Sequence, residues 1–429
     1  MQAFILAGGK GTRLSSITKG EVAKPMAEIC GKPIIAYVLQ NLKDNGITDI
    51  IISVGFLKES IMNFVKDGGD FGVSVSYVEE DQPLGSGGAL YYLKGKVKDD
   101  FIVCPGDALF DVDFSRMEKF HKEKGGLITL LTHPNLHPYD SDLIVADKNG
   151  LVTKFYRKNE ERDFYYKNCV NAGIIMINAR ALDGLTEPKK MNMEHDFVAP
   201  FIAEGKVYSY SSCEYVKDVG TADRFELASK EIDLGIPHQK NLKNKQKAVF
   251  LDRDGTINAY RGFIKSAEEI SLLPTVEKAI GKLNKSGYLA IIISNQPVIA
   301  RGEATFQDVE QTFDKIETLL GKSGVYIDGV YYCPHHPHSG FEGEVKSLKF
   351  DCDCRKPKIG LIQKAVSDFN LDLSKCYMVG DSDVDVLTGK NANIKTVRVE
   401  TGVPSKEEIT PDFIALTLEH AIDLILKDE

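Results

Sequence analysis

Short apolar runs alternate with stretches of helical spacing over residues 1–232. The pattern predicts strands at 3–6, 49–54, 73–78 and 101–104, with helices at 33–42, 58–66 and 87–97 between them. Such alternation is typical of a mainly parallel sheet with helices on both faces. Closely spaced apolar runs predict added mixed or antiparallel strands at 127–131, 143–146, 152–156 and 173–177, and a helix over 222–232 ends the region.

A polar, basic run from His238 to Lys247 separates this region from a second alternation. There we predict strands at 248–251, 289–294, 330–333 and 377–379, separated by helices near 276–285, 306–320 and 361–369. The pattern again predicts a doubly wound α/β sheet, in which ligands bind at the carboxyl ends of strands. We therefore predict two α/β domains, the first Rossmann-like with a mixed sheet, at 1–234 and 247–429, joined by a linker at 235–246.

The bulk composition narrows the class of protein. A chain of 429 residues favours two or three compact units, and its net charge of -9 argues against a nucleic-acid partner. No apolar stretch reaches the length of a membrane span, and the first ten residues lack the basic start of a signal peptide. Three of the eight cysteines fall in one metal-like cluster. We expect a cytoplasmic, reduced protein that acts on small molecules and contacts no membrane, with oligomerisation left open.

The first candidate site begins at a glycine loop after the first strand, AGGKGTR at residues 7–13. Backbone N–H groups near Gly8, Gly9, Gly11 and Thr12 can approach phosphates closely, because glycine has no side chain to block them. The spacing is neither the Walker motif nor G-x-G-x-x-G. The loop alone is weak evidence, because a tight turn between strand and helix explains many such loops.

Two cations and two carboxylates strengthen the assignment of this site. Arg13 and Lys24 lie near the loop in sequence, whereas Asp107 and Asp218 each follow a predicted strand. Two aspartates that converge on a phosphate site suit Mg²⁺-dependent phosphoryl or nucleotidyl transfer.

These residues belong to a longer set of motifs. LAGGKGTRL, AKPM, QPLGSGG, the Gly-Asp pair at 106–107, VNAG and KDVG occur in this order. Residues 1–232 thereby resemble the sugar-1-phosphate nucleotidyltransferase family. The resemblance implies attack of a sugar-1-phosphate oxygen on the α-phosphorus of a nucleoside triphosphate, with release of pyrophosphate.

The resemblance also implies a role for each matching residue. Asp107 and Asp218 would hold Mg²⁺, Arg13 would bind the pyrophosphate, and Lys24 would bind the α-phosphate and the sugar phosphate. The remaining implied contacts are Gly8 and the stretch from Gln82 to Gly85 at the base, and Asn171 and Glu194 at the sugar. At residues 156–158 the sequence Tyr-Arg-Lys departs from the acid-lysine pair that often approaches the sugar in this family.

The second candidate site begins with Asp252 and Asp254, directly after an apolar strand. A carboxylate at this position can act as a nucleophile toward phosphate, and one two residues later as a general acid and base. Ser294 and Asn295 follow the next strand and offer a hydroxyl and an amide to phosphate oxygens. Arg355 and Lys356 supply cations, and Asp381, in the run GDSDVD, supplies a carboxylate that binds metal.

A dense cluster of thiols and imidazoles lies within this second region. Cys333 and His335, followed by Cys352 and Cys354, give four ligands on two tight loops, which suits tetrahedral zinc. His336 or His338 could replace His335, and the spacing does not decide between them. Four protein ligands leave no open position, so a structural role is the better interpretation.

The order of these motifs over residues 247–405 resembles the haloacid-dehalogenase-like (HAD-like) phosphatases. Their zinc-bearing subclass includes histidinol-phosphate phosphatases and D-glycero-D-manno-heptose 1,7-bisphosphate 7-phosphatases, and YYCPHHP, CDCRKP and IARG resemble the heptose enzymes more closely. The resemblance implies Asp252 as the nucleophile, Asp254 as the acid and base, and Mg²⁺ on Asp252, the Asp254 carbonyl and Asp381. It also implies Ser294 and Lys356 at the phosphate and Arg355 at the sugar. Asn295-Gln-Pro-Val replaces the expected Gln-Ser-Gly.

The two resemblances together predict a bifunctional enzyme of activated-heptose synthesis, because a phosphatase and a nucleotidyltransferase act consecutively there. We choose GTP, since the first family includes heptose guanylyltransferases; the α-anomer would lead to GDP and the β-anomer to ADP. Three alternatives stay open: another sugar bisphosphate or triphosphate, one half that is inactive and regulatory, and a scaffold for nucleic acid or another partner that uses the basic linker.

Overall fold

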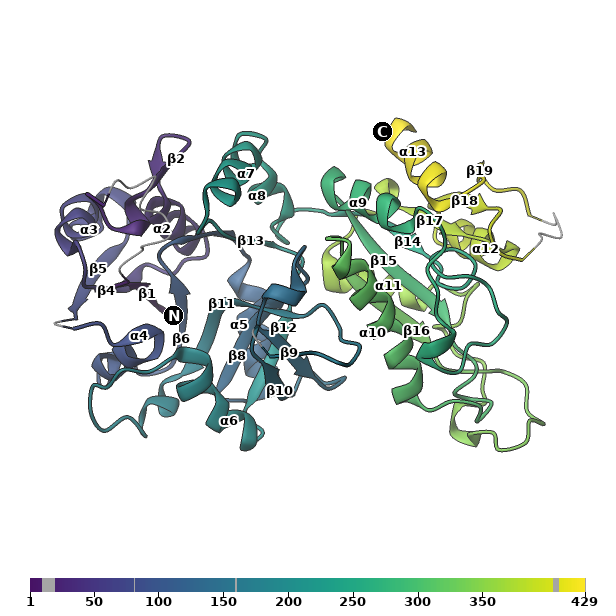
Figure 1. Cartoon of the computed structure of the whole chain (residues 1–429), viewed down its shortest axis with the longest axis horizontal. Coiled ribbons are helices and arrows are strands. Elements are labelled where there is room, and N and C mark those ends of the chain that lie inside the picture. The colour runs from purple at the N-terminus through teal and green to yellow at the C-terminus, as the bar shows by residue number, and fades with distance from the viewer. Residues whose placement is uncertain (10–19, 81, 159, 404–408, 429) are drawn as a thin grey trace. The chain divides into compact units, whose positions relative to one another are not determined.

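The computed structural model describes residues 1–9, 20–80, 82–158, 160–403 and 409–428. Its contacts divide the chain into two units (Figure 1). The first comprises residues 1–133, 142–157 and 170–241, and the second comprises 134–141, 158–169 and 242–429. Two short segments from the N-terminal half of the sequence therefore belong to the second unit.

A nine-stranded mixed sheet forms the centre of the first unit, in the order β10-β9-β11-β6-β1-β4-β5, with β8 paired to β11 and β12 to β8. β1, β4, β5 and β6 pair in parallel, whereas β11 is antiparallel to β6, β8 and β9. The strands are β1 (Gln2–Ala7), β4 (Asp49–Val54), β5 (Ser74–Glu79), β6 (Asp100–Pro105), β8 (Ile128–His133), β9 (Leu143–Ala146), β10 (Val152–Tyr156), β11 (Val170–Asn178) and β12 (Val207–Ser211). The predicted mixed sheet is confirmed.

Helices and two small ribbons complete the first unit. The helices are α2 (Ile34–Asp44), α3 (Lys58–Val65), α4 (Gly85–Gly88), α5 (Phe114–Lys124), α6 (Ala199–Ala203), α7 (Ala222–Asp233) and α8 (Ile236–Lys240). The ribbons pair β2 (Glu28–Ile29) with β3 (Lys32–Pro33), and β7 (Ala108–Asp111) with β13 (Tyr215–Asp218). Apolar residues of β1, β4 and β6 pack with α2 and α3 in one core. This core fixes the carboxyl ends of the strands from which the first site is built.

The second unit contains a six-stranded parallel sheet in the order β16-β15-β14-β17-β18-β19. Its strands are β14 (Lys247–Leu251), β15 (Tyr288–Asn295), β16 (Gly329–Cys333), β17 (Tyr377–Gly380), β18 (Lys395–Val399) and β19 (Phe413–Ala415). β14 and β15 are almost continuously apolar, as expected for parallel strands covered on both faces. The predicted doubly wound architecture is confirmed here as well.

The helices of the second unit are α9 (Val276–Ser286), α10 (Phe306–Lys322), α11 (Gly360–Phe369), α12 (Asp383–Asn391) and α13 (Leu418–Asp428). α9 and α13 pack against each other, and their apolar faces share one core with the central strands. Capping boxes at Thr305 and Ser382 begin α10 and α12, where the hydroxyl accepts from the N3 backbone and the N3 aspartate accepts from the cap backbone. Local sequence therefore sets where both helices begin.

Residues 134–141 and 158–169 contribute to the second unit through α10. The Tyr166 N–H donates to Thr318 Oγ1 at 2.9 Å, and Thr318 Oγ1 donates to the Tyr166 carbonyl at 3.1 Å. The two segments are joined to each other by Arg162, which donates to the carbonyls of Pro138 at 2.7 Å and Ser141 at 2.5 Å. Nothing in the sequence pattern predicts this arrangement.

Two regions differ from the expected local structure. The helix predicted over 87–97 is instead the single turn α4 followed by a 3-10 helix at Ala89–Leu93, because Gly85, Gly87 and Gly88 pack closely against residues 189–193. Within the predicted linker, residues 236–240 form α8, and Leu242 is buried. The domain boundaries 1–234 and 247–429 stay a prediction.

Two candidate active sites and a candidate metal centre

Strand pairing brings the two predicted metal carboxylates of the first unit together. In the ribbon of β7 and β13, Asp218 lies opposite Ala108, the residue that follows Asp107. Lys24, almost fully buried on a 3-10 turn, places its Nζ 2.6 Å from Asp107 Oδ2 and 3.7 Å from Asp218 Oδ1. Arg224 donates to Asp218 Oδ2 at 2.9 Å. Three elements distant in sequence thus build one cluster of charges.

The donor set of this cluster suits a hard divalent cation. Asp107 and Asp218 offer carboxylate oxygens, which are the ligands that Mg²⁺ prefers. The Lys24 ammonium supplies the positive charge of this cluster nearest to both carboxylates.

The beginning of the glycine loop lies against Glu80. A Cβ at Gly8 would come 2.5 Å from Glu80 Oε1 and would displace that carboxylate, whereas a Cβ at Gly9 would meet nothing within 4 Å. Burial raises the pKa of Glu80, against hydrogen bonds from the Leu84 backbone and the Ser53 hydroxyl. Gly11, Thr12 and Arg13 lie outside the described residues.

The predicted base-binding stretch is arranged around α4. Gln82 is exposed, and Gly85 has a φ of +74° with its Cα facing the Met191 carbonyl, which a Cβ would approach to 2.4 Å. Only glycine adopts this conformation at this distance without strain. Ser86 Oγ accepts from the Met193 N–H at 2.9 Å, which fixes α4 against the segment that carries Glu194.

The two residues predicted to face the sugar lie side by side. Asn171 Nδ2 donates to Glu194 Oε1 at 3.1 Å, and Asn171 Oδ1 accepts from the Gly173 N–H at 3.1 Å. Burial raises the pKa of Glu194, and the nearby charge of Asp142 acts in the same direction. The pair offers both a donor and an acceptor to hydroxyl groups.

In the second unit, Lys356 joins two buried carboxylates. Asp252 follows β14, and Asp385 lies in the first turn of α12; Lys356 Nζ is 2.5 Å from Asp252 Oδ1 and 2.6 Å from Asp385 Oδ1. Ligand atoms of Asp252, Asp381 and Asp385 all lie within 4.8 Å of one another. Burial raises the pKa of Asp252, with the Lys356 ammonium opposing it and the neighbouring carboxylates adding to it. Three buried carboxylates around one ammonium suit a further divalent cation.

Asp254 points its carboxylate to a different set of partners. Arg253, fully buried, forks onto it with Nε at 3.1 Å and Nη2 at 2.7 Å. Asn258 Nδ2 donates to it at 3.0 Å and Gln296 Nε2 at 3.1 Å. The Asp254 carboxylate therefore has hydrogen-bond partners different from the partner of Asp252, although the two residues are two positions apart.

The predicted phosphate and sugar residues gather around the Lys356 backbone. Asn295 Oδ1 accepts from the Lys356 N–H at 3.0 Å and its Nδ2 donates to the Lys356 carbonyl at 3.1 Å, so Asn295 fixes the loop rather than pointing freely outward. Ser294 is buried and its Oγ accepts from Gln296 at 2.9 Å. Arg355 Nη1 donates to the His335 carbonyl at 3.2 Å, which connects it to the thiol cluster.

Sequence reasoning missed two functional residues here. Asp385 lies in the run GDSDVD, in which only Asp381 was predicted to bind metal. The capping box between Ser382 and Asp385, which turns Asp385 back toward the end of the strand, was the signal that could have identified it. Gln296 links Ser294 to Asp254, and its position directly after Asn295 was the only hint.

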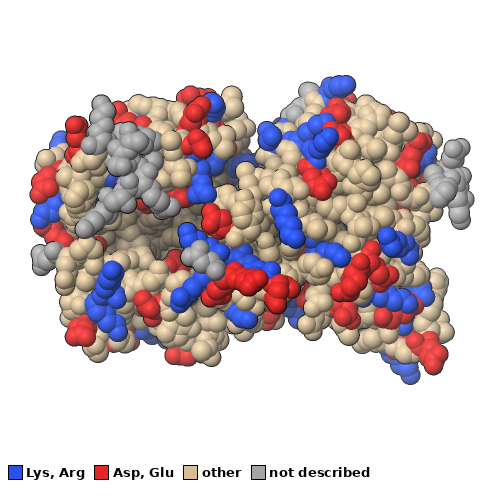
Figure 2. Space-filling model, viewed as in Figure 1, with Lys and Arg blue, Asp and Glu red and all other residues tan. Residues whose placement is uncertain are grey.

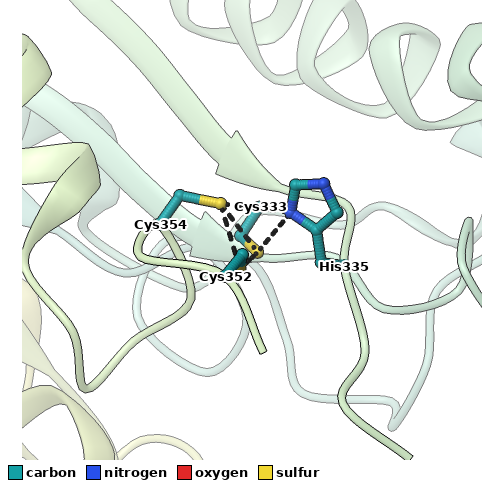
Figure 3. Close-up of side chains that lie close together, drawn as sticks. All are labelled: Cys333, His335, Cys352 and Cys354. Atoms are coloured by element: carbon teal, nitrogen blue, oxygen red, sulfur yellow. Dashed lines mark hydrogen bonds between the residues drawn. The ribbon is translucent and has the colours of Figure 1, made fainter. Parts of the chain in front are cut away.

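Four side chains of the cysteine cluster converge on one point (Figure 3). Cys354 Sγ lies 3.2 Å from both Cys333 Sγ and His335 Nδ1 and 3.3 Å from Cys352 Sγ. A tetrahedral zinc with Zn–S bonds of about 2.3 Å sets neighbouring sulfurs about 3.8 Å apart, so this compact group fits the ion. His336 Nδ1 instead lies 3.0 Å from the His338 carbonyl. Of the three histidines, the group therefore contains His335.

On the drawn face of each unit, Lys and Arg side chains lie scattered among Asp and Glu side chains, and other residues make up most of the surface (Figure 2). Local positive potential for an anionic substrate thus comes from single side chains such as Lys24 and Lys356. Among the described residues, every helix is too short or too polar to cross a membrane.

The geometry defines an α/β enzyme with two phosphate-handling sites, and comparisons with known proteins agree. The nucleotidyl transferase family model matches residues 2–233, and a HAD-hydrolase-like model matches residues 353–421. The D-glycero-beta-D-manno-heptose-1,7-bisphosphate 7-phosphatase of Haemophilus ducreyi is 40% identical over 184 residues, which cover 42% of this chain and 97% of that protein. The enzyme of the same name from Escherichia coli K12 is 37% identical over 180 residues, covering 42% and 87%.

One solved structure, HddC from Yersinia pseudotuberculosis complexed with GMP-PN, is 23% identical; the match covers 54% of this chain and 99% of that one, with a TM-score of 0.46.

The chain belongs to the nucleotidyl transferase family in its N-terminal half and to the HAD-type heptose bisphosphate phosphatase family in its C-terminal half. It is a bifunctional enzyme that carries a nucleotidyltransferase and a phosphatase. Membership in these families implies small nucleotides and sugar phosphates as substrates.

Proposed function

We propose that this protein carries out two consecutive steps of activated-heptose synthesis. Its second unit removes the 7-phosphate of D-glycero-D-manno-heptose 1,7-bisphosphate, and its first unit transfers GMP from GTP to the resulting heptose 1-phosphate. The observation that carries the proposal is the occurrence, on one chain, of the Asp107–Lys24–Asp218 cluster and of a second unit that is 40% identical to a heptose bisphosphate phosphatase.

In the phosphatase, Asp252 is the nucleophile. An Asp252 oxygen forms a bond to phosphorus while the bond from phosphorus to the heptose oxygen breaks, and Asp254 gives that oxygen a proton. Water then attacks the aspartyl phosphate, Asp254 takes the proton from the water, and phosphate leaves Asp252. Lys356 Nζ, at 2.5 Å from Asp252 Oδ1, and the buried Ser294 hydroxyl bind the phosphate oxygens, and Arg355 contacts the sugar.

In the transferase, a phosphate oxygen of the sugar 1-phosphate attacks the α-phosphorus of the triphosphate, and the bond to pyrophosphate breaks. Lys24 binds the α-phosphate and the sugar phosphate, and Arg13 binds the departing pyrophosphate. Backbone N–H groups at Gly8, Gly9, Gly11 and Thr12 would bind the phosphates, and the stretch from Gln82 to Gly85 would contact the base. The hydrogen-bonded pair of Asn171 and Glu194 orients the sugar.

Three metal ions complete the proposal. Mg²⁺ would be held by Asp107 and Asp218 in the first unit, and by Asp252, the Asp254 carbonyl and Asp381 in the second, where Asp385 also lies within reach. Zn²⁺ would be held by Cys333, His335, Cys352 and Cys354. Bound Mg²⁺ neutralises phosphate charge, and zinc with four protein ligands stabilises the loop that leads to Arg355.

A second candidate uses the β-anomer and ATP. The phosphatases of Haemophilus ducreyi and Escherichia coli K12 that resemble this chain carry the β-anomer in their names. A phosphatase selective for that anomer would supply a heptose 1β-phosphate, and the activated sugar would then be ADP-linked.

The experiment measures phosphate and pyrophosphate release by the full chain from both anomers of the bisphosphate, with GTP or ATP. We expect phosphate from the α-anomer alone and pyrophosphate only when GTP is added. Preference for the β-anomer with ATP would establish the second candidate instead. No phosphate release from either anomer would refute the heptose assignment.

A further inference from the structure

Arg253 lies between the two aspartates of the phosphatase site and is among the largest fully buried side chains of the described chain. A buried guanidinium is costly unless nearly all of its N–H groups find acceptors. Here Nε and Nη2 bind the Asp254 carboxylate, and Nη1 donates to Thr312 Oγ1 at 2.8 Å. The side chain thus connects one proposed catalytic group directly to helix α10.

The acceptor on α10 is itself fixed in orientation. Thr312 is fully buried, and its hydroxyl donates to the Val309 carbonyl at 2.6 Å, which leaves its lone pairs for Arg253. The next residue, Phe313, lies under the guanidinium with its ring centre 5.1 Å from Cζ. Hydroxyl and ring together fix the plane of the guanidinium, and a planar fork in turn fixes the plane of the carboxylate it binds.

The partners of Asp254 show what this arrangement does. Its carboxylate accepts from Arg253, from Asn258 and from Gln296, and none of these donors comes from the group around Asp252, Asp381 and Asp385. The Asp254 side chain is 17% exposed, so part of its carboxylate is accessible to solvent. Arg253, which is anchored on α10, therefore provides the fork that fixes the carboxylate, and the exposed part stays accessible from solvent.

We propose that Arg253, oriented by Thr312, is a positioning residue that holds Asp254 where it exchanges protons with the leaving group and then with the attacking water. The proposal rests on the phosphatase function proposed above. A purely structural ion pair would also bury Arg253. The two interpretations differ in which chemical step fails when the fork is lost.

The substrate 4-nitrophenyl phosphate separates these steps. Its leaving group departs as nitrophenolate without a proton, so transfer of phosphate to Asp252 needs no acid. Hydrolysis of the aspartyl phosphate still needs Asp254 as a base, because the attacking water must lose a proton. Misplacement of Asp254 thus slows only the second step with this substrate, and phosphoenzyme accumulates.

The test uses stopped-flow release of nitrophenolate by the full chain with Arg253→Lys, which keeps the charge but loses the fork, and with Thr312→Val, which loses the hydroxyl at similar volume. We expect a burst that approaches one nitrophenolate per chain, then steady turnover about tenfold or more below wild type. KM should fall in proportion, because kcat/KM reports the unchanged first step. Thr312→Ser should restore wild-type behaviour, and Arg261→Lys, on an exposed arginine of the same loop, should leave it unchanged.

Melting temperature and the inhibition constant of inorganic phosphate show whether each variant is folded with an intact phosphate site. Folded variants without a burst, or a Thr312→Ser variant that behaves like Thr312→Val, would overturn the proposal. If Arg253→Lys does not fold, Thr312→Val alone decides. If the wild-type protein releases no phosphate, the phosphatase function itself is refuted. If the wild-type protein is active and the folded variants show no burst, only the positioning role of Arg253 is refuted.

Discussion

Asn168 donates its backbone N–H to Glu317 Oε2 at 2.8 Å, and both residues are almost fully buried. Asn168 belongs to the segment 158–169 between β10 and β11, and Glu317 lies on α10 of the phosphatase unit. Thr318 adds two hydrogen bonds to Tyr166 in the same segment. The phosphatase unit is therefore completed by residues from the N-terminal half of the sequence, and a chain cut before Leu242 would lack them.

Substitution of Thr318 by Val tests this contact. The change removes the hydroxyl from the Tyr166 N–H and carbonyl and leaves both without that partner. We expect the free energy of unfolding of this unit to fall by about 1–3 kcal/mol, measured by urea denaturation. Thr153→Val, on an exposed strand position, should cost much less. Equal effects of the two changes would contradict the contact.

The charge cluster beside this segment predicts a pH dependence. Burial raises the pKa of Asp314 to about 7; the charges of Glu317 and Glu310 add to the rise, and Lys167 opposes it. The folded state therefore binds a proton more tightly than the unfolded chain, whose carboxyl pKa is 3.8. This contribution to stability is fully present below the unfolded pKa and is lost as the pH rises through about 7.

The measurement compares the wild-type protein with Asp314→Asn by urea denaturation from about pH 5 to pH 8. We expect the free energy of unfolding to fall with pH in the wild type and to stay flatter in the variant. Asp70→Asn, at an exposed carboxylate paired with Lys66, is the control and should retain the wild-type slope. If the free energy of unfolding fell equally with pH in Asp314→Asn and in the wild type, Asp314 would not be the cause of the pH dependence.

The local pattern of apolar residues was sufficient to predict most strands of the two sheets. The features that were not predicted depend on contacts between residues far apart in sequence. The strand at 49–54 was predicted because four of its six residues are Ile or Val. Binding of residues 158–169 to α10 instead depends on single hydrogen bonds between residues far apart in sequence. The expected helix at 87–97 was wrong because glycines suited to close packing determine that segment, not helical spacing.

Site residues that belong to a short sequence motif were easier to predict than residues whose role depends on the direction of their side chains. Cys352 and Cys354 were visible as a pair because both lie on one tight loop. Among Asp381, Asp383 and Asp385, only the start of α12 and its capping box decide which carboxylates face Lys356. Likewise, His335 differs from His336 only in the direction of its ring.

Substitution of Lys24 by Met should separate the two activities. The change keeps a long side chain but removes the ammonium between Asp107 and Asp218. We expect nucleotidyl transfer, measured as pyrophosphate release, to fall about 10²- to 10³-fold, because a buried charge at the phosphates is lost. Phosphate release by the second unit should stay within about twofold. Lys32→Met, at an exposed lysine, should change neither activity; a Lys24→Met enzyme with full transferase activity would remove Lys24 from the site.

Removal of the proposed zinc should disable the phosphatase through its loop. Cys352→Ser replaces a buried thiol of the four-residue group with a poorer zinc ligand. We expect the zinc content, measured by atomic emission, to fall from one ion per chain to nearly none, with a lower melting temperature. Phosphate release should fall at least about tenfold because the cluster fixes Arg355 through the His335 carbonyl. Cys30→Ser, at an exposed cysteine, should retain metal and activity, whereas a Cys352→Ser protein that keeps its zinc would show that these four side chains are not the ligands.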